Sequence, residues 1–189
     1  MENIVFVTTN KGKIATAQQY FKKAKLETYN YDLIEPRSDD IQEIAKSKVI
    51  QAYELVKRPC IALDSGFFIE ALNGFPRAFV NFALNTLGIE GILRTMNGIE
   101  NRSCCFRECL AYFDGKDIKY FFCEHEGILS EKIKGMENPE KWSDLWYIFI
   151  PEYSKDGRTL SEYSIEETHE RREKIDSSIK QFANWYENK

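Results

Sequence analysis

The sequence contains no uninterrupted apolar run approaching the ~20 residues that a membrane-spanning helix requires. The apolar run Ile4 to Val7 is too short for the core of a signal peptide, and it follows the acidic Glu2. Glycine (10 residues) and proline (5 residues) are scarce among 189 residues, which excludes collagen-like and low-complexity chains. We therefore expect a cytoplasmic protein with no membrane partner.

Basic residues are not in excess, because 26 Lys and Arg stand against 30 Asp and Glu, for a net charge of −4. This balance argues against a nucleic-acid partner, which requires a broad basic surface, but it allows a small anion in a local basic pocket. The five cysteines are odd in number and show no Cys-x-x-Cys spacing of a metal site. Free and mostly buried thiols in a reducing compartment are expected.

With 43% hydrophobic residues, the chain can bury a core, and its length predicts a single domain over residues 1–189. Continuous apolar runs predict strands buried on both faces, and apolar residues at helical spacing predict helices. The expected strands cover residues 4–7, 60–63, 103–113 and 118–126, and the expected helices cover 14–25, 41–56 and one or two parts of 164–185. The alternation of strands and helices, followed by a hairpin, predicts an α/β fold with a mixed sheet.

A polar segment with the sequence Thr-Thr-Asn-Lys-Gly-Lys joins the first expected strand to the first helix. Such loops bind anions, because free N–H groups and the helix dipole point at the ligand. The hydroxyls of Thr8 and Thr9, the Asn10 amide and the Lys13 ammonium group would add donors. The alternative is a polar loop that only caps the helix, and the two interpretations are equally compatible with these residues alone.

Two acidic positions stand out. Asp64 follows four apolar residues and precedes Ser65 and a glycine, so the strand is expected to stop there and to deliver a carboxylate that needs a partner or a metal ion. Glu43 falls in the first turn of the expected helix 41–56, where the helix dipole favours a carboxylate even without a function. Lys48 lies on the same helix and would ordinarily be a solvated surface residue.

Taken together, these segments resemble the inosine triphosphate pyrophosphatases, which remove pyrophosphate from nonstandard purine nucleoside triphosphates. The resemblance is carried by the order of five pieces: the polar loop after the first strand, an acid opening the second helix, Asp64-Ser65-Gly66, Leu72-Asn73-Gly74-Phe75-Pro76, and the more weakly matching region 105–151. It implies an elongated mixed β-sheet flanked by helices, with two lobes around a central cleft. It also implies a homodimer and a Mg²⁺ cofactor.

The resemblance implies a role for each matching residue. Thr8, Thr9, Asn10 and Lys13 match the loop that holds the triphosphate, with Lys48 as a further triphosphate-binding lysine and Ser65 as a phosphate contact. Glu43 and Asp64 match the acids that bind Mg²⁺. Asp64 also matches the catalytic proton acceptor for the attacking water.

The chain departs from the family at the base-binding motifs. The stretch Ser143-Asp144-Leu145-Trp146 replaces the usual Phe-Gly-[Tyr/Trp]-Asp, and Arg172-Glu173-Lys174 stands where Ser-His-Arg is usual. Trp146 is therefore the expected aromatic contact to the base and Arg172 the expected base or phosphate contact, and Asp144 as a base-reading acid and Arg171 or Lys174 in place of Arg172 stay open as alternatives. His125 and His169 have no neighbouring nucleophile in the sequence. Two alternatives stay open: hydrolysis of a different modified or standard nucleotide, and a non-catalytic nucleotide-binding protein.

Overall fold

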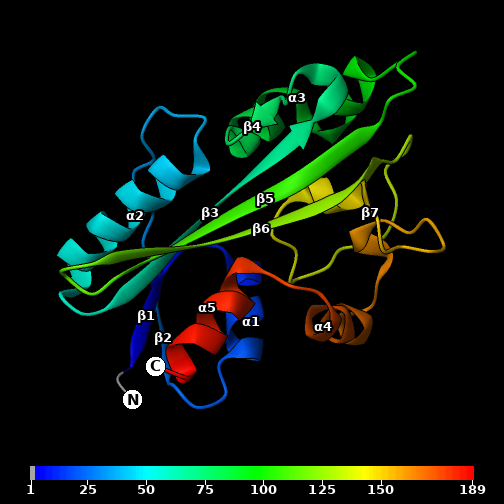
Figure 1. Cartoon of the computed structure of the whole chain (residues 1–189). Helices are drawn as coiled ribbons and strands as arrows, with labels where there is room; N and C mark the ends of the chain where they lie inside the picture. Colours follow the sequence, from blue (N-terminus) through cyan, green and yellow to red (C-terminus); the bar gives the residue numbers. More distant parts are fainter. Residues whose placement is uncertain (1–2) are drawn as a thin grey trace.

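The computed structural model describes residues 3–189, and within that range it shows a long open sheet covered by helices (Figure 1). The seven strands of the described range belong to one sheet with the order β2-β1-β3-β5-β6-β7, and β4 pairs with β3. β1 runs parallel to β2 and β3, and the other pairs are antiparallel. This arrangement confirms the predicted mixed α/β fold.

The elements follow the sequence prediction in type and order, and their bounds differ most at the third strand and at the first helix, which was expected over 14–25. The strands are β1 (Ile4–Val7), β2 (Leu26–Tyr29), β3 (Cys60–Ile69), β4 (Pro76–Arg77), β5 (Ser103–Phe113), β6 (Ile118–Leu129) and β7 (Phe149–Pro151). The helices are α1 (Lys11–Tyr20), α2 (Ile41–Val56), α3 (Val80–Thr95), α4 (Ile165–Lys174) and α5 (Ser178–Glu187), with 3-10 turns η1 (Glu70–Leu72), η2 (Asp144–Tyr147) and η3 (Leu160–Glu162). The prediction that the third strand stops at Asp64 is wrong, because β5 pairs with β3 residue by residue up to Ile69.

Helices cover both faces of the sheet near β1, as the continuous apolar runs predicted. Successive side chains of a strand point to opposite faces, so neighbouring residues join different cores. On one face, α2 packs Ala45, Val49 and Ala52 against Val5, Val7 and Cys109. On the other face, α1 and α5 pack Ala17 and Phe182 against Ile4, Phe6 and Leu110.

A third core lies at the far end of the long strands, where α3, β7 and η2 gather (Figure 1). Its largest members include Phe67 from β3, Ile92 from α3 and Phe149 from β7. The chain thus forms two lobes joined by β3, β5 and β6. No helix within residues 3–189 combines the length and the apolarity that a membrane span needs.

Candidate active site

The site begins where a short strand lies beside a long one. β1 pairs with the start of β3 through Val5–Cys60 and Phe6–Ile61, and it ends at Val7. β3 continues for several residues beyond that point, so its edge is free at Asp64 and Ser65. The polar loop after β1 meets this free edge, and both line one cavity.

The loop after β1 is built as a helix N-terminus held in place by side chains. Thr8 Oγ1 accepts a hydrogen bond from the Asn10 backbone N–H at 3.1 Å, and Asn10 Oδ1 caps α1 by accepting from the Lys13 N–H at 2.9 Å. Asn10 Nδ2 also donates to the carbonyl of Trp142 at 2.8 Å. Gly12 is required here, because a Cβ on it would lie 2.4 Å from the carbonyl oxygen of Lys141.

Lys13 points from α1 towards β3. Its side-chain nitrogen donates to the carbonyl of Leu63 at 3.4 Å, and the residue is only 9% exposed. Burial, aided by the nearby positive charge of Lys48, lowers the pKa of Lys13 to about 8. The carboxylates of Asp64, Glu108 and Glu35 offset only part of this lowering, so a bound anion would further favour the charged form of Lys13.

Lys48 connects two carboxylates at the same edge. Its Nζ lies 2.8 Å from Glu35 Oε1 and 3.2 Å from Asp64 Oδ1. Burial alone would lower the pKa of Lys48, but Asp64 and Glu35 outweigh it and the pKa is raised. Burial raises the pKa of Asp64, against the attraction of Lys48 and Lys13. The Oδ2 atom of Asp64 is buried and has no hydrogen-bond partner, so it is open to a ligand.

Glu43 lies elsewhere. It occupies the first turn of α2, and its Oε2 accepts from Ser38 Oγ at 2.7 Å on the exposed side of the helix. Glu43 is not among the residues that line the cavity, whereas Glu35 is. The structure therefore does not bring Glu43 and Asp64 together in the cavity, and it places Glu35 with Asp64 instead.

Another part of the cavity wall is aromatic and basic. Trp146 is buried and lines the cavity, and the guanidinium of Arg171 lies 5.5 Å from the centre of its ring. Arg171 also donates to the hydroxyl of Tyr153 at 2.7 Å. Arg172 reaches the cavity, but its Nη1 is 2.5 Å from Glu140 Oε2, and burial lowers its pKa. Arg171 is thus the less tightly paired of the two arginines.

Comparison with known proteins decides the family. Residues 4–185 match the family model described as the Ham1 family. The chain belongs to the Ham1 family. It is 38% identical over 167 residues to a dITP/XTP pyrophosphatase of Saccharolobus solfataricus, covering 85% of this chain and 82% of the relative. It is 34% identical over 191 residues to a dITP/XTP pyrophosphatase of Methanopyrus kandleri, covering 98% and 96%.

Solved structures agree with this assignment at the level of the fold. A HAM1 protein from Coxiella burnetii has a TM-score of 0.81 at 20% identity and covers 100% of both chains. The Staphylococcus aureus Ham1 protein has a TM-score of 0.77 at 22% identity and covers 100% of this chain and 99% of its own. The family resemblance and the fold predicted from the sequence are both confirmed.

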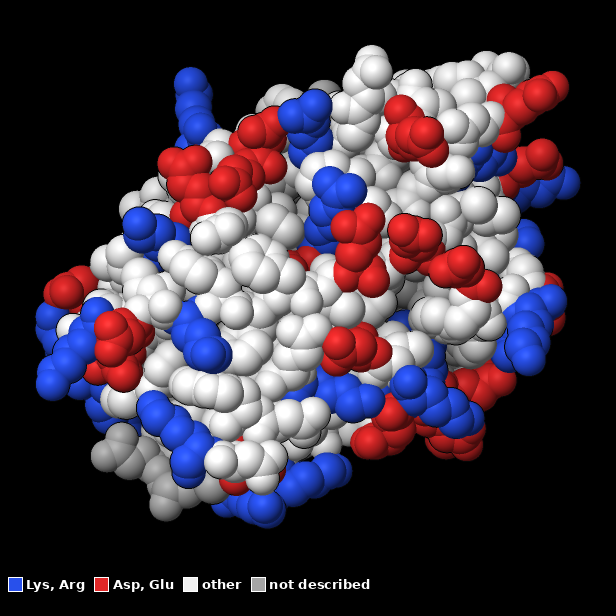
Figure 2. Space-filling view, in the orientation of Figure 1, with Lys and Arg blue, Asp and Glu red and all other residues white. Residues whose placement is uncertain are grey.

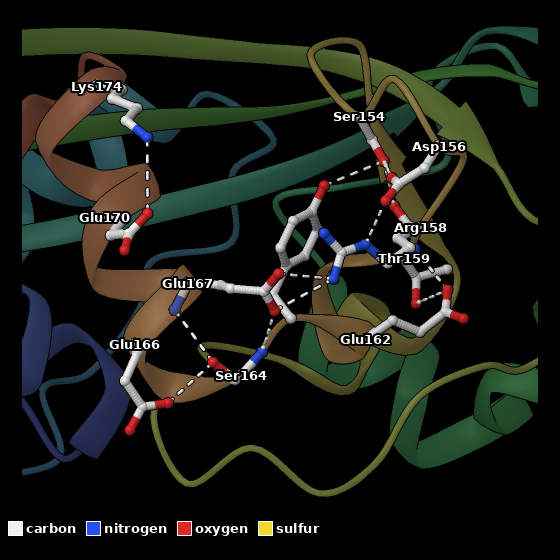
Figure 3. Close-up of polar contacts among 11 residues, drawn as sticks. Ser154, Asp156, Arg158, Thr159, Glu162, Ser164, Glu166, Glu167, Glu170 and Lys174 are labelled. Atoms are coloured by element: carbon white, nitrogen blue, oxygen red, sulfur yellow. Dashed lines mark hydrogen bonds and ion pairs between the residues drawn. The ribbon is translucent and has the colours of Figure 1, made fainter.

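The segment before α4 positions Arg171 and Arg172 of this Ham1-family chain. Arg158 bonds Asp156 Oδ2 at 2.6 Å and Glu167 Oε1 at 2.9 Å (Figure 3). Ser164 and Glu167 form a capping box at the start of α4, which satisfies the first backbone N–H groups of the helix. These contacts anchor α4 beside the cavity and so position Arg171 and Arg172.

The cavity contains charges of both signs, as does the outer surface. Acidic and basic side chains are interspersed over the face shown in Figure 2. Lys13, Lys48, Arg171 and Arg172 line the cavity together with Asp32, Glu35, Asp64 and Glu108. Lys48 is paired with Glu35 and Asp64, and Arg172 with Glu140, so Lys13 and Arg171 are the cavity cations that a small anionic ligand would meet.

Three cavity residues had no predicted role in the sequence. Glu35 could have been suspected, because it precedes Pro36 in a polar segment just ahead of α2. Glu108 and His125 lie on β5 and β6 and face the same cavity. No local sequence pattern marked Glu108 or His125 as a cavity residue, because their proximity depends on the pairing of β5 with β6.

Proposed function

We propose that this chain hydrolyses a nonstandard purine nucleoside triphosphate, such as XTP, dITP or ITP, to the monophosphate and pyrophosphate. The observation that carries the proposal is the meeting of a capped phosphate-type loop with the buried Asp64 at the free edge of β3. The names of the two archaeal relatives support the substrate class. The proposal covers the whole described chain, which we take as a single domain.

The residues at this edge fit a Mg²⁺ ion. Mg²⁺ prefers oxygen ligands and is usually held by one or two carboxylates together with substrate phosphates. The partnerless Oδ2 of Asp64 and the carboxylate of Glu35 supply such ligands, with Lys48 between them. Within residues 3–189 there is no cluster of three or more His, Cys, Asp or Glu side chains that could hold a metal ion. When bound, the ion would neutralise phosphate charge.

The side chains of the cavity then bind the polyphosphate, offset its charge and activate the attacking water. Thr8, Thr9 and Asn10 hold the polyphosphate through hydroxyl, amide and backbone donors, and Ser65 adds a contact from the strand edge. Lys13 and Lys48 offset the charge that develops on the departing pyrophosphate. Asp64, whose pKa is raised by burial, orients the attacking water and accepts its proton.

The nucleoside is held at the other end of the cavity. Trp146 offers an aromatic surface, and Arg171 and Arg172 lie beside it. Arg172 is bound to Glu140, so it positions the wall of the cavity, and Arg171 is the arginine that faces the ligand. This set replaces the motifs that the family ordinarily uses.

A substrate panel tests the proposal. The protein is incubated with Mg²⁺ and XTP, dITP, ITP or each standard nucleoside triphosphate, and monophosphate and pyrophosphate are measured. The expected result is fastest cleavage of XTP, dITP or ITP. Asp64→Asn should lower turnover by at least about 10²–10³-fold while circular dichroism stays unchanged. Preference for another base, or binding without turnover, would establish one of the alternative functions instead.

Two further properties belong to the proposal. We infer a homodimer, which is supported by Phe75, Phe79 and Phe82, because each is at least 36% exposed and all fall near the start of α3. Light scattering tests this assembly. We also infer a cytoplasmic location, supported by the free cysteines, four of them buried.

A further inference from the structure

A buried ion pair lies on the floor of the nucleotide cavity and has no part in the mechanism above. His125 Nε2 on β6 is 3.0 Å from Glu108 Oε1 on β5, and both residues line the cavity. Glu108 is 4% exposed. Its other oxygen accepts from the hydroxyl of Ser178 at 2.8 Å and from the Ser178 N–H at 3.2 Å.

The pair is built to keep the histidine charged. Burial alone would lower the pKa of His125, but hydrogen bonds with Cys123 and Glu108 outweigh burial and raise it to about 10. Burial would raise the pKa of Glu108, but its contacts with His125 and Ser178 hold it below the ordinary value. An imidazolium ring has two donors and no acceptor. One donor is used by Glu108, and the ring also interacts with Cys123, a weak acceptor that a ligand oxygen can replace.

The position of the pair along the cavity indicates which part of a nucleotide it meets. Ser65 pairs with Glu108, and Phe106 pairs with His125, so these side chains share one face of the sheet. From β1 to β6 there are three strand spacings of about 4.8 Å, or roughly 14 Å. That is the reach from the terminal phosphate of an extended nucleoside triphosphate to its base. Glu108 interacts electrostatically with Lys13, and His125 lies one strand further from β1, so we place His125 next to the phosphates on the side of the nucleoside.

We propose that the Glu108–His125 pair is a specificity determinant that favours nucleobases presenting a carbonyl oxygen to the cavity floor over bases presenting an amino group. The inference rests on the proposed function. A donor-only imidazolium pairs with the oxo group of xanthine or hypoxanthine, whereas the amino group of adenine or cytosine would leave two donors facing each other. Glu108 acts as a positioning residue, because it orients the ring and holds its charge.

The test compares His125→Gln and Glu108→Gln with a matched control on the same two strands. Arg107 and Glu124 form an ion pair at 2.8 Å between β5 and β6 on the opposite, exposed face. The control variant is Arg107→Gln. For each protein, kcat/KM is measured for XTP, dITP, ATP and CTP, together with inhibition by inorganic pyrophosphate, which lacks a base.

The expected result is a loss of selectivity. His125→Gln should lower kcat/KM for XTP and dITP by about 10- to 100-fold, the value of one charged hydrogen bond, and leave ATP and CTP within about twofold. Glu108→Gln should shift selectivity in the same direction, and Arg107→Gln should not. Inhibition by pyrophosphate should be unchanged in all three variants.

Several results would overturn the inference. They are unchanged selectivity, an equal loss for every nucleotide, or a loss of pyrophosphate inhibition that places the pair at the phosphates. If wild-type protein hydrolyses nothing, the proposed function fails, and the pair is still tested by calorimetric binding of XMP and AMP. Wild type should prefer XMP, and His125→Gln should lose that preference. Equal XMP and AMP binding by wild type would then refute the assignment.

Discussion

Replacing Lys48 with methionine should destabilise the protein in a way that depends on pH. Methionine keeps the length and apolar stem of the side chain and removes its charge. In the wild type, Lys48 Nζ contacts Glu35 at 2.8 Å and Asp64 at 3.2 Å. The variant leaves Asp64, whose side chain is 7% exposed, without its cation, whereas Glu35, 47% exposed, can be solvated by water.

The magnitude follows from that asymmetry. Removing one partner of a buried ion pair costs about 3–5 kcal/mol, and exposed pairs contribute about 0–1 kcal/mol. Only the Asp64 contact counts in full, so Lys48→Met should lower the free energy of unfolding by roughly 3 kcal/mol near neutral pH. Burial already raises the pKa of Asp64, and loss of Lys48 raises it further. The cost is therefore present when Asp64 is ionised, and it disappears as the pH falls and Asp64 is protonated.

Urea unfolding from about pH 4 to about pH 8 measures this dependence. The double variant Lys48→Met with Asp64→Asn removes the unpaired charge and should recover most of the lost stability. Lys174→Met is the control, because its ion pair with Glu170 spans 3.7 Å and is exposed, and it should stay within about 0.5 kcal/mol of wild type. A loss of stability in Lys48→Met that is equal at both ends of the pH range, or is not relieved by Asp64→Asn, would refute the reasoning.

Three further predictions concern the same cavity. Glu35→Gln should raise the Mg²⁺ concentration needed for half-maximal turnover by about tenfold or more, whereas Glu43→Gln should change it by no more than about twofold. A larger effect of Glu43→Gln than of Glu35→Gln would restore Glu43 as the metal ligand. Inorganic pyrophosphate should bind wild type less tightly as the pH rises through about 8, where Lys13 loses its proton, and Lys13→Arg should flatten that part of the calorimetric titration. His125→Gln should lower the free energy of unfolding, measured with urea, because the folded state holds the His125 proton more tightly than the unfolded chain. The loss should be greatest below pH 6.5 and should vanish as the pH approaches about 10. A loss that is constant across that range would contradict the charged pair.

Much of the fold could be predicted from local patterns. Apolar runs and helical spacing indicated β1, α2 and the β5–β6 hairpin, because each of these is determined within a window of one or two elements. The loop after β1 was also visible, since its Thr, Asn and Lys residues lie next to one another in the chain. The cap that Asn10 makes on α1 is local as well, because it joins Asn10 to Lys13, three residues further along the chain.

The acidic pair could not be predicted in the same way. The family resemblance implied Glu43 as a metal ligand, yet a carboxylate in the first turn is stabilised by the helix dipole alone, and its oxygen is held by Ser38. Glu35 enters the cavity from an irregular segment ahead of α2 whose path depends on tertiary packing. Lys48 on α2 connects Glu35 to Asp64 on β3. No local sequence pattern predicts this contact between α2 and β3.

The Glu108–His125 pair shows the same dependence in the sheet itself. In the sequence the two residues are seventeen positions apart, and each lies in a strand of an ordinary hairpin, with burial that is continuous from Glu108 to Tyr112 in β5 and alternates in β6. Only the register between β5 and β6 places the imidazole against the carboxylate, and only the extension of β3 beyond β1 opens that face to a ligand. A buried charge pair of this kind contributes little net stability compared with apolar residues of the same volume. Its presence on the floor of the cavity is therefore better explained by the base that it selects than by the stability that it adds.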